Sequence, residues 1–243
     1  MKNIALAAGT LLLGLFSAQA EIVPIVLTGW NQDVIAENNA GSTPLLETTA
    51  ATPFGWSFFA QGAPNSSGLT GLPVNGTIQS AFNSAVTFQL QPFTGNNVIL
   101  NSGTLTLSTP GRYAALSFLS TGTVHTDSAV LNFSDGTSTT LSASVPDWTQ
   151  NGNVAFHGTG LLVTRGSSWS GFWTGGLSLF EDDFTLSAVD QAKTLDSISI
   201  NSTSVLMAVS GTNLSTATPE PSTFLLLGTV LTGLGIIRRR KSA

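Results

Sequence analysis

The chain of 243 residues contains no cysteine, one tyrosine and two histidines, and only 9 % of its residues are charged. Without cysteine it has neither disulfides nor thiolate ligands, so its stability must come from an ordinary hydrophobic core. His125 and His157 lie in sequence rich in Gly, Ser and Thr, without the paired spacing of a zinc site. No Gly-x-Ser-x-Gly sequence occurs either, so these common hydrolase motifs are missing.

Basic residues are scarce between the two ends of the chain. From Glu21 to Ala217 there are twelve acidic residues and only three basic ones, Arg112, Arg165 and Lys193, which gives a net charge of −9. Such a surface repels nucleic acid, because nucleic-acid binding requires Lys and Arg to displace counterions. We therefore expect no nucleic-acid partner, and the charge favours divalent cations and neutral polymers instead.

Apolar runs long enough to cross a membrane comfortably are also missing. The apolar run near the N-terminus has the length of an export signal. Lys2 provides a positive start, Ile4–Phe16 is apolar, and Ala18-Gln19-Ala20 is a small-x-small cleavage site. An apolar run of 13 residues is too short to cross a bilayer core of about 30 Å. The sequence therefore predicts a signal peptide over residues 1–20, with the Sec translocon as its partner.

The C-terminal end has three parts. Thr218 to Thr223 is a Pro-rich polar segment, 224–237 is apolar apart from Gly and Thr, and a basic cluster follows. As a helix the apolar part would be about 21 Å long, a marginal span for the inner membrane. The cluster of Arg238, Arg239, Arg240 and Lys241 would stay on the cytoplasmic side. This arrangement indicates a membrane-inserted sorting signal.

The motif in this tail resembles the PEP-CTERM sorting signal of Gram-negative, exopolysaccharide-producing bacteria. The residues that carry the resemblance are Pro219, Glu220, Pro221, Ser222 and Thr223, with the apolar and basic segments after them. The resemblance covers residues 218–243 and implies recognition and processing by a membrane-embedded exosortase. It also implies an address at the cell surface or in the extracellular matrix.

Between the ends, apolar and polar residues alternate with the period of β-strands. Thr104–Ser108 alternates, and Ala129, Leu131 and Phe133 fall on one face of another run. Asp135-Gly136 before Leu141, Ala143 and Val145 predicts a tight hairpin. Short runs broken by Gly, Ser and Asn continue to residue 210. We therefore expect an all-β, antiparallel sandwich of jelly-roll type over 21–210, and a linker over 211–217.

The ectodomain also resembles β-sandwich ectodomains that occur with this tail, and some carbohydrate-binding jelly rolls. The stretches concerned are 29–37, 71–73, 88–92 with 96–98, 133–137 and Asp147-Trp148. The resemblance implies a sandwich fold and points to a glycan ligand. Fold similarity alone does not establish a function.

Acidic clusters make structural calcium the one cofactor to consider. Calcium binds six to eight hard oxygens, many of them from carboxylates. The candidate ligands are Asp33 and Glu37 near the N-terminus, and Asp182 and Asp183 before a late strand, 184–188. In a jelly roll the first and last strands lie close, so the two pairs could meet. A solvated acidic surface is the alternative.

Tryptophans offer a candidate glycan platform. Trp169 and Trp173 are separated by Ser, Gly and Phe, and their spacing places both on one face of an extended strand. Trp148 follows the acidic residue of the Asp-Trp pair. Exposed indoles stack on sugars, but tryptophans are also common in cores. A place in the core therefore remains the alternative for these residues. Trp30 is expected in the core.

Together these features predict an exported, non-catalytic surface or matrix protein that binds exopolysaccharide. One alternative is a secreted carbohydrate-active hydrolase, for which the acidic residues would supply two carboxylates across a cleft. Another is a structural coat subunit without a ligand.

Overall fold

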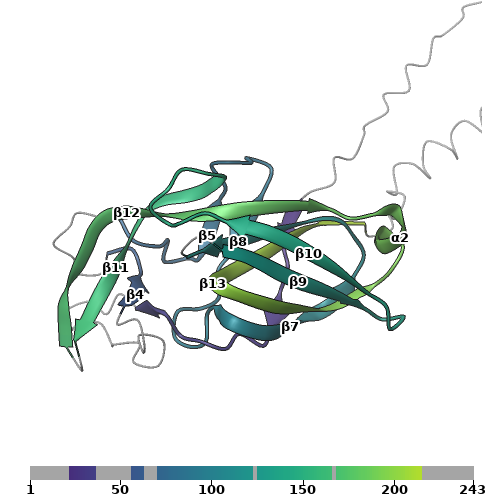
Figure 1. Cartoon of the computed structure of the whole chain (residues 1–243), viewed down its shortest axis with the longest axis horizontal. Helices are drawn as coiled ribbons and strands as arrows, with labels where there is room; N and C mark the ends of the chain where they lie inside the picture. The colour runs from purple at the N-terminus through teal and green to yellow at the C-terminus, as the bar shows by residue number, and fades with distance from the viewer. Residues whose placement is uncertain (1–21, 37–55, 63–69, 123–124, 166–167, 215–243) are drawn as a thin grey trace, which may run out of the picture.

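The computed structural model describes residues 22–36, 56–62, 70–122, 125–165 and 168–214 (Figure 1). Within them the chain forms thirteen strands and one short helix. The strands are β1 (Ile22–Pro24), β2 (Leu27–Thr28), β3 (Ile35–Ala36), β4 (Trp56–Phe59), β5 (Thr77–Gln79), β6 (Thr87–Gln89), β7 (Ile99–Gly111), β8 (Tyr113–Thr121), β9 (His125–Phe133), β10 (Ser138–Val145), β11 (Val154–Arg165), β12 (Ser168–Thr185) and β13 (Leu195–Asn213). The helix is α2 (Ala188–Gln191).

Eleven of these strands belong to one sheet, whose main path runs β10-β9-β13-β8-β12-β11-β4-β3. Strands β1 and β7 pair with β13, β2 pairs with β7, and β5 and β6 form a separate two-stranded sheet. The pairing is antiparallel except between β3 and β4. The described strands therefore confirm the all-β, antiparallel character of the fold.

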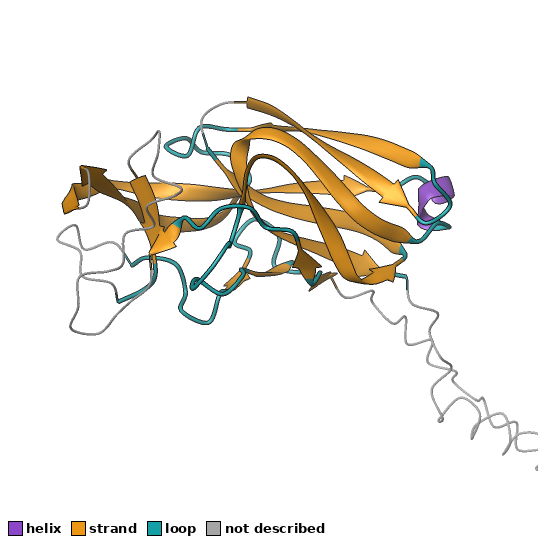
Figure 2. Ribbon diagram, turned by 90° about the horizontal axis from the view of Figure 1, so that it is seen from below, coloured by secondary structure: helices purple, strands orange, loops and turns teal. Residues whose placement is uncertain are grey.

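Strand β13 organises the sheet because it has two sets of neighbours. Its first part pairs with β9, with Asn201 opposite Ser128, and its second part pairs with β8, with Val205 opposite Thr121. Strands β8 and β9 thus follow one another along the same edge of β13. The pairing with β7 shifts register between Asn201 and Val205, which marks a bulge there. Bulges bend strands, and the sheet curls (Figures 1 and 2).

Two hydrophobic clusters form the core. One includes Leu105, Leu131, Ile198 and Phe118, on the inward side of the curled strands. The other includes Phe58, Phe88, Leu119 and Met207, with other residues of β3 to β6, β11 and β12. Residues 118 and 119 are adjacent on β8 and belong to different clusters. The strand therefore separates the two cores, as alternation along a strand requires.

The predicted two-sheet jelly roll is not confirmed, because eleven strands are joined in a single sheet. Strand β13 also continues through residues 211–213, where the linker was expected to begin. No helix among the described residues is long and apolar enough to cross a membrane. The predicted signal peptide (1–20) and the sorting tail (218–243) lie outside the described residues.

Candidate binding face and buried carboxylates

The outward side of β2, β7, β13, β9 and β10 carries an uncharged polar surface, which we call the polar face. Because the strands pair in register, their outward residues form rows across the sheet. In one row Ser197 lies between Asn132 and Thr106; in the next, Ser199 lies between Val130 and Thr104. The face comprises Thr28, Ser102, Thr104, Thr106, Thr126, Ser128, Val130, Asn132, Ser138, Thr140, Ser142, Ser144, Ser197, Ser199 and Asn201.

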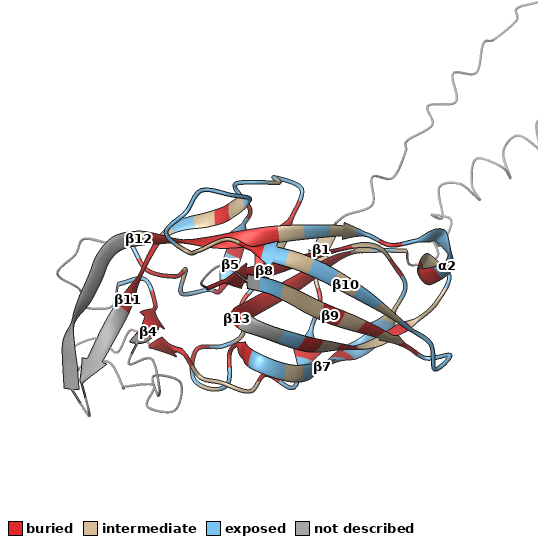
Figure 3. Ribbon diagram, in the orientation of Figure 1, coloured by how far each residue is buried: buried red, intermediate tan, exposed pale blue. Residues whose placement is uncertain are grey.

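Alternation along each strand produces this face. The residues between the outward positions, among them Leu105, Leu131 and Ile198, are buried in the core. The outward residues on β7, β9 and β10 are exposed or half-buried (Figure 3). A buried apolar side thus fixes which side of the sheet faces solvent.

Hydrogen bonds between side chains hold the polar face in place. The Asn132 amide donates to the hydroxyls of Ser197 at 3.2 Å and Ser199 at 3.1 Å. The hydroxyls of Ser199 and Thr104 lie 3.2 Å apart, so one donates to the other. These bonds cross from β9 over β13 to β7. Side chains fixed in this way lose little further freedom when they bind a ligand.

The polar face is broad, and its side chains are uncharged and, with one exception, polar. Three of its rows span four strands, which at about 4.8 Å between strands and 6.8 Å between rows gives roughly 14 Å by 14 Å. It has no ionisable side chain, although the segment from 21 to 217 carries a net charge of −9. Of the fifteen residues only Val130 lacks a hydroxyl or an amide. The face can therefore donate and accept many hydrogen bonds without attracting ions.

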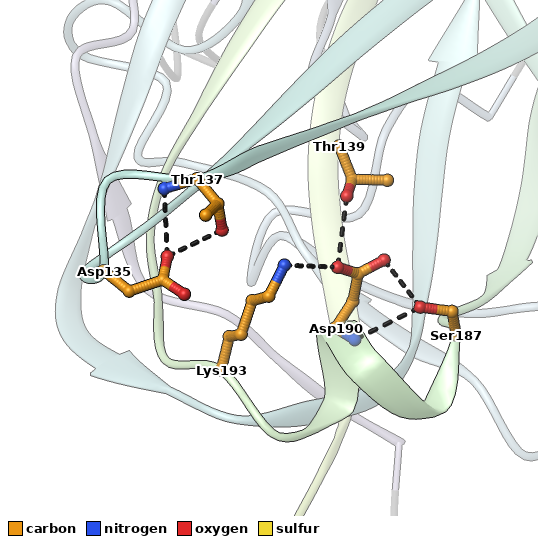
Figure 4. A network of polar contacts seen from close by, with 6 residues as sticks. All are labelled: Asp135, Thr137, Thr139, Ser187, Asp190 and Lys193. Carbon is orange, nitrogen blue, oxygen red and sulfur yellow. Dashed lines mark hydrogen bonds and ion pairs between the residues drawn. The ribbon is translucent and has the colours of Figure 1, made fainter.

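One end of β10 is fastened to α2 by the network in Figure 4. The Asp190 carboxylate accepts hydrogen bonds from Thr139 of β10, from Ser187 and from Lys193, the last at 3.0 Å. Burial tends to raise the pKa of Asp190, but these three donors together lower it. In the β9–β10 hairpin Asp135 accepts from Thr137, which lowers the pKa of Asp135. These contacts fix the position of β10 and so one margin of the polar face.

The acidic run 181–183 lies within β12 rather than before a strand, and its side chains alternate between the two sides. Glu181 is fully buried, and burial raises its pKa to about 7, with Asp183 and Asp182 adding to the effect. Asp183 accepts a hydrogen bond of 2.5 Å from Ser117. Asp182 points to the other side, toward Asp127. Burial, then the nearby charge of Asp127, raises the pKa of Asp182 to about 6.

Two of the predicted platform tryptophans lie on β12 and the third lies elsewhere. Trp169 is paired with Thr164 and Trp173 with Leu161 of β11, but their side chains lie outside what the structure describes. Trp148 is half-buried and packs against a core cluster. Trp30 is buried, as predicted, and its indole donates to the Leu27 carbonyl at 3.1 Å.

The described members of the predicted calcium set do not gather at one place. Asp33 accepts a hydrogen bond of 2.6 Å from the Asn97 amide, whereas Asp182 and Asp183 point to opposite sides of β12. Glu37 lies outside the described residues. Among those described, no three His, Asp or Glu side chains form a group that could hold a metal ion.

Comparison with known proteins identifies the tail. Residues 217–241 match the PEP-CTERM protein-sorting motif. The match covers all but the last two residues of the predicted sorting signal, 218–243. It marks an exported protein, targeted to the cell envelope and processed by an exosortase. A comparison with curated proteins found no match.

The sequence interpretation overlooked the polar face. A signal was present in the alternation of Ser138, Thr140, Ser142 and Ser144 with apolar residues of β10. The same alternation occurs around Thr104 on β7. That these strands lie in one surface follows only from the pairing through β13.

Proposed function

We propose that this exported protein is a non-catalytic component of the cell surface or matrix, which binds a neutral exopolysaccharide through the polar face. The observation that carries the proposal is the array of hydroxyl and amide groups on five paired strands, without a charged side chain. Polysaccharides carry many closely spaced hydroxyl groups, each of which can donate and accept hydrogen bonds. A fixed array of the same groups can match them over several sugar units.

The expected binding is weak at each contact and additive over the face. A hydrogen bond contributes about 0.5–1.5 kcal/mol net, because each one replaces bonds to water. The face has no aromatic side chain for stacking, so several contacts are needed to offset the loss of freedom on binding. Long polymers supply them, and we therefore expect longer chains to bind more tightly than short oligosaccharides.

The buried carboxylates support a non-catalytic function over the hydrolase alternative. Asp127 and Asp182 line one cavity of about 30 Å³. That volume holds about one or two water molecules, and a sugar ring needs far more. A pair of carboxylates at a glycosidic bond requires a cleft open to the substrate.

The proposal is tested with full-length protein in detergent and soluble polysaccharides: a neutral β-glucan, a neutral galactomannan and the acidic polymer alginate. We expect binding to at least one neutral polymer and none to alginate, since like charges repel. Binding should change little between 50 and 500 mM salt, because hydrogen bonds between neutral groups are not screened.

The double variant Thr140→Val, Ser142→Ala locates the binding. It removes two hydroxyls from the polar face and keeps residues suited to a strand, so affinity should fall about 5- to 100-fold. The matched control is Thr94→Val, Ser84→Ala, which makes the same changes at exposed turn residues off the face. Equal affinity of the two double variants, both folded, would refute the proposal.

A further inference from the structure

The curled sheet leaves a small cavity between β10 and β12. It measures about 30 Å³ and is bounded by residues of β8, β9, β10, β12 and β13. Five oxygen-bearing side chains line it, those of Asp127, Asp182, Ser120, Ser204 and Ser128, while Phe118 and other apolar residues form much of the rest. The polar groups come from four different strands or strand segments. The fold therefore assembles them, because Asp182 and Ser204 are far from Ser120 and Asp127 in the sequence.

Three of these side chains carry buried oxygens that lack a hydrogen-bond partner of normal geometry among the described residues. They are Oδ1 of Asp127, Oδ2 of Asp182 and Oγ of Ser120. Ser120 is only 4 % exposed, and its hydroxyl lies beside the Asp182 carboxylate. Ser204 donates a hydrogen bond to the other oxygen of Asp127. Buried polar groups are rarely left unpaired, so this cluster needs a further partner.

The nature of the missing partner follows from charge. Two carboxylates in one apolar cavity repel each other, and each loses its hydration. None of the described residues that line the cavity is basic. A bound divalent cation would neutralise both carboxylates and also accept oxygen ligands from the hydroxyls of Ser120 and Ser204. Uncharged water could fill the volume, but it could not offset the repulsion.

We propose that Asp127, Asp182, Ser120 and Ser204 form a calcium site that ties β12 to β9 and β13. Calcium prefers hard oxygens, accepts irregular geometry and needs six to eight ligands. Two carboxylates and two hydroxyls can supply up to six, and water can complete the shell. Magnesium keeps several of its waters in a strict octahedron. The hydrated magnesium ion is therefore too large for this cavity. With only two carboxylates we expect a dissociation constant of about 10⁻⁴ M, in the range of extracellular calcium modules.

The test measures calcium binding to the full-length protein by equilibrium dialysis and its melting temperature with 5 mM calcium or with chelator. We expect one calcium ion per chain and a rise in melting temperature of about 5–10 °C. Asp127→Asn and Asp182→Asn should each weaken binding at least tenfold. Ser120→Ala should weaken calcium binding several-fold without changing the charge. This milder variant tests the site if the Asp variants do not fold.

The matched control is Asp33→Asn, which removes a carboxylate from the set predicted by sequence and lies outside the cavity. It should bind calcium like the parent. The proposal is overturned if the parent binds no calcium, or if Ser120→Ala binds it with unchanged affinity. Loss of binding in Asp33→Asn would likewise overturn it, and would assign calcium to the other set.

Discussion

Glu181 is a fully buried acid on β12, and replacing it with glutamine measures what its charge costs the fold. Neither of its carboxylate oxygens has a hydrogen bond of normal geometry among the described residues, although the Ser80 hydroxyl lies nearby. Its pKa is raised from the ordinary 4.5 to about 7. The folded protein therefore holds a proton on Glu181 that the unfolded chain releases between these values.

The sign of the pH dependence follows from this difference. Where the folded state binds more protons than the unfolded state, stability falls as pH rises. The contribution of Glu181 is complete below pH 4.5 and is lost as the pH rises through about 7. One pKa unit corresponds to about 1.4 kcal/mol, which limits the loss to about 3 kcal/mol. Proteins relax around a buried group when it ionises, which reduces this cost, so we expect about 1–2 kcal/mol.

Glu181→Gln keeps the size of the side chain and removes its charge. At pH 8.5 the free energy of unfolding of the variant should exceed that of the parent by about 1–2 kcal/mol, and at pH 4 the two should agree. Denaturant unfolding of the full-length protein at both pH values measures the difference. The control Asp183→Asn changes the neighbouring exposed acid and should give a smaller effect. A variant that is less stable than the parent at pH 8.5, or equal to it, would refute the reasoning.

Three further predictions concern the tail, a glycine and the tryptophans. Replacing residues 219–221 with alanine should leave unprocessed protein in the membrane fraction on an immunoblot, and normal maturation would contradict the sorting assignment. Gly29→Ala should destabilise the fold by more than 1 kcal/mol in denaturant unfolding, because φ is +100° and a Cβ would lie 2.3 Å from the Thr104 carbonyl oxygen; unchanged stability would contradict that geometry. If Trp169 and Trp173 form a second platform, changing either to alanine should weaken glycan binding about tenfold, and equal binding by folded variants would exclude it.

Local patterns were sufficient to predict several strands and one turn. The Asp135-Gly136 hairpin is confirmed: Gly136 has a φ of +81°, and the Asp135 carboxylate accepts from the Thr137 backbone at 2.9 Å. The inward positions Leu131 and Phe133 are buried as the alternation predicts. Such features depend on residues that are neighbours in sequence. The turn can be predicted because tight hairpins require positive φ, which glycine adopts readily.

The lengths of the late strands could not be predicted, because bulges resemble turns in sequence. Residues 195–200 and 205–209 have the sequence pattern of two separate strands, because polar residues stand between them. In the structure both belong to β13, with a register shift between Asn201 and Val205. Likewise β11 continues past Gly158, whose φ of +102° accompanies a register shift. Polar residues and glycine mark an interruption in both cases, and only the partner strand decides between a bulge and a turn.

The candidate sites depended still more on long-range pairing. Ser199 acquires its place in the polar face from Val130 on one side and Thr104 on the other, roughly 70 to 95 residues earlier in the chain. Asp182 and Asp183 looked like one acidic cluster because they are adjacent in sequence. On a strand adjacency separates their side chains, and Asp182 instead faces Asp127.

The most direct test of the polar face is a map of where the sugar binds. Amide chemical shifts of the isotope-labelled full-length protein would be followed while oligosaccharides of the neutral polymer that binds best are added. We expect the largest changes at outward residues of β7, β9, β10 and β13, such as Thr104, Asn132, Thr140 and Ser199, with little change in the β11–β12 arm around Trp169 and Trp173. Changes confined to that arm, or none at saturating oligosaccharide, would contradict the account.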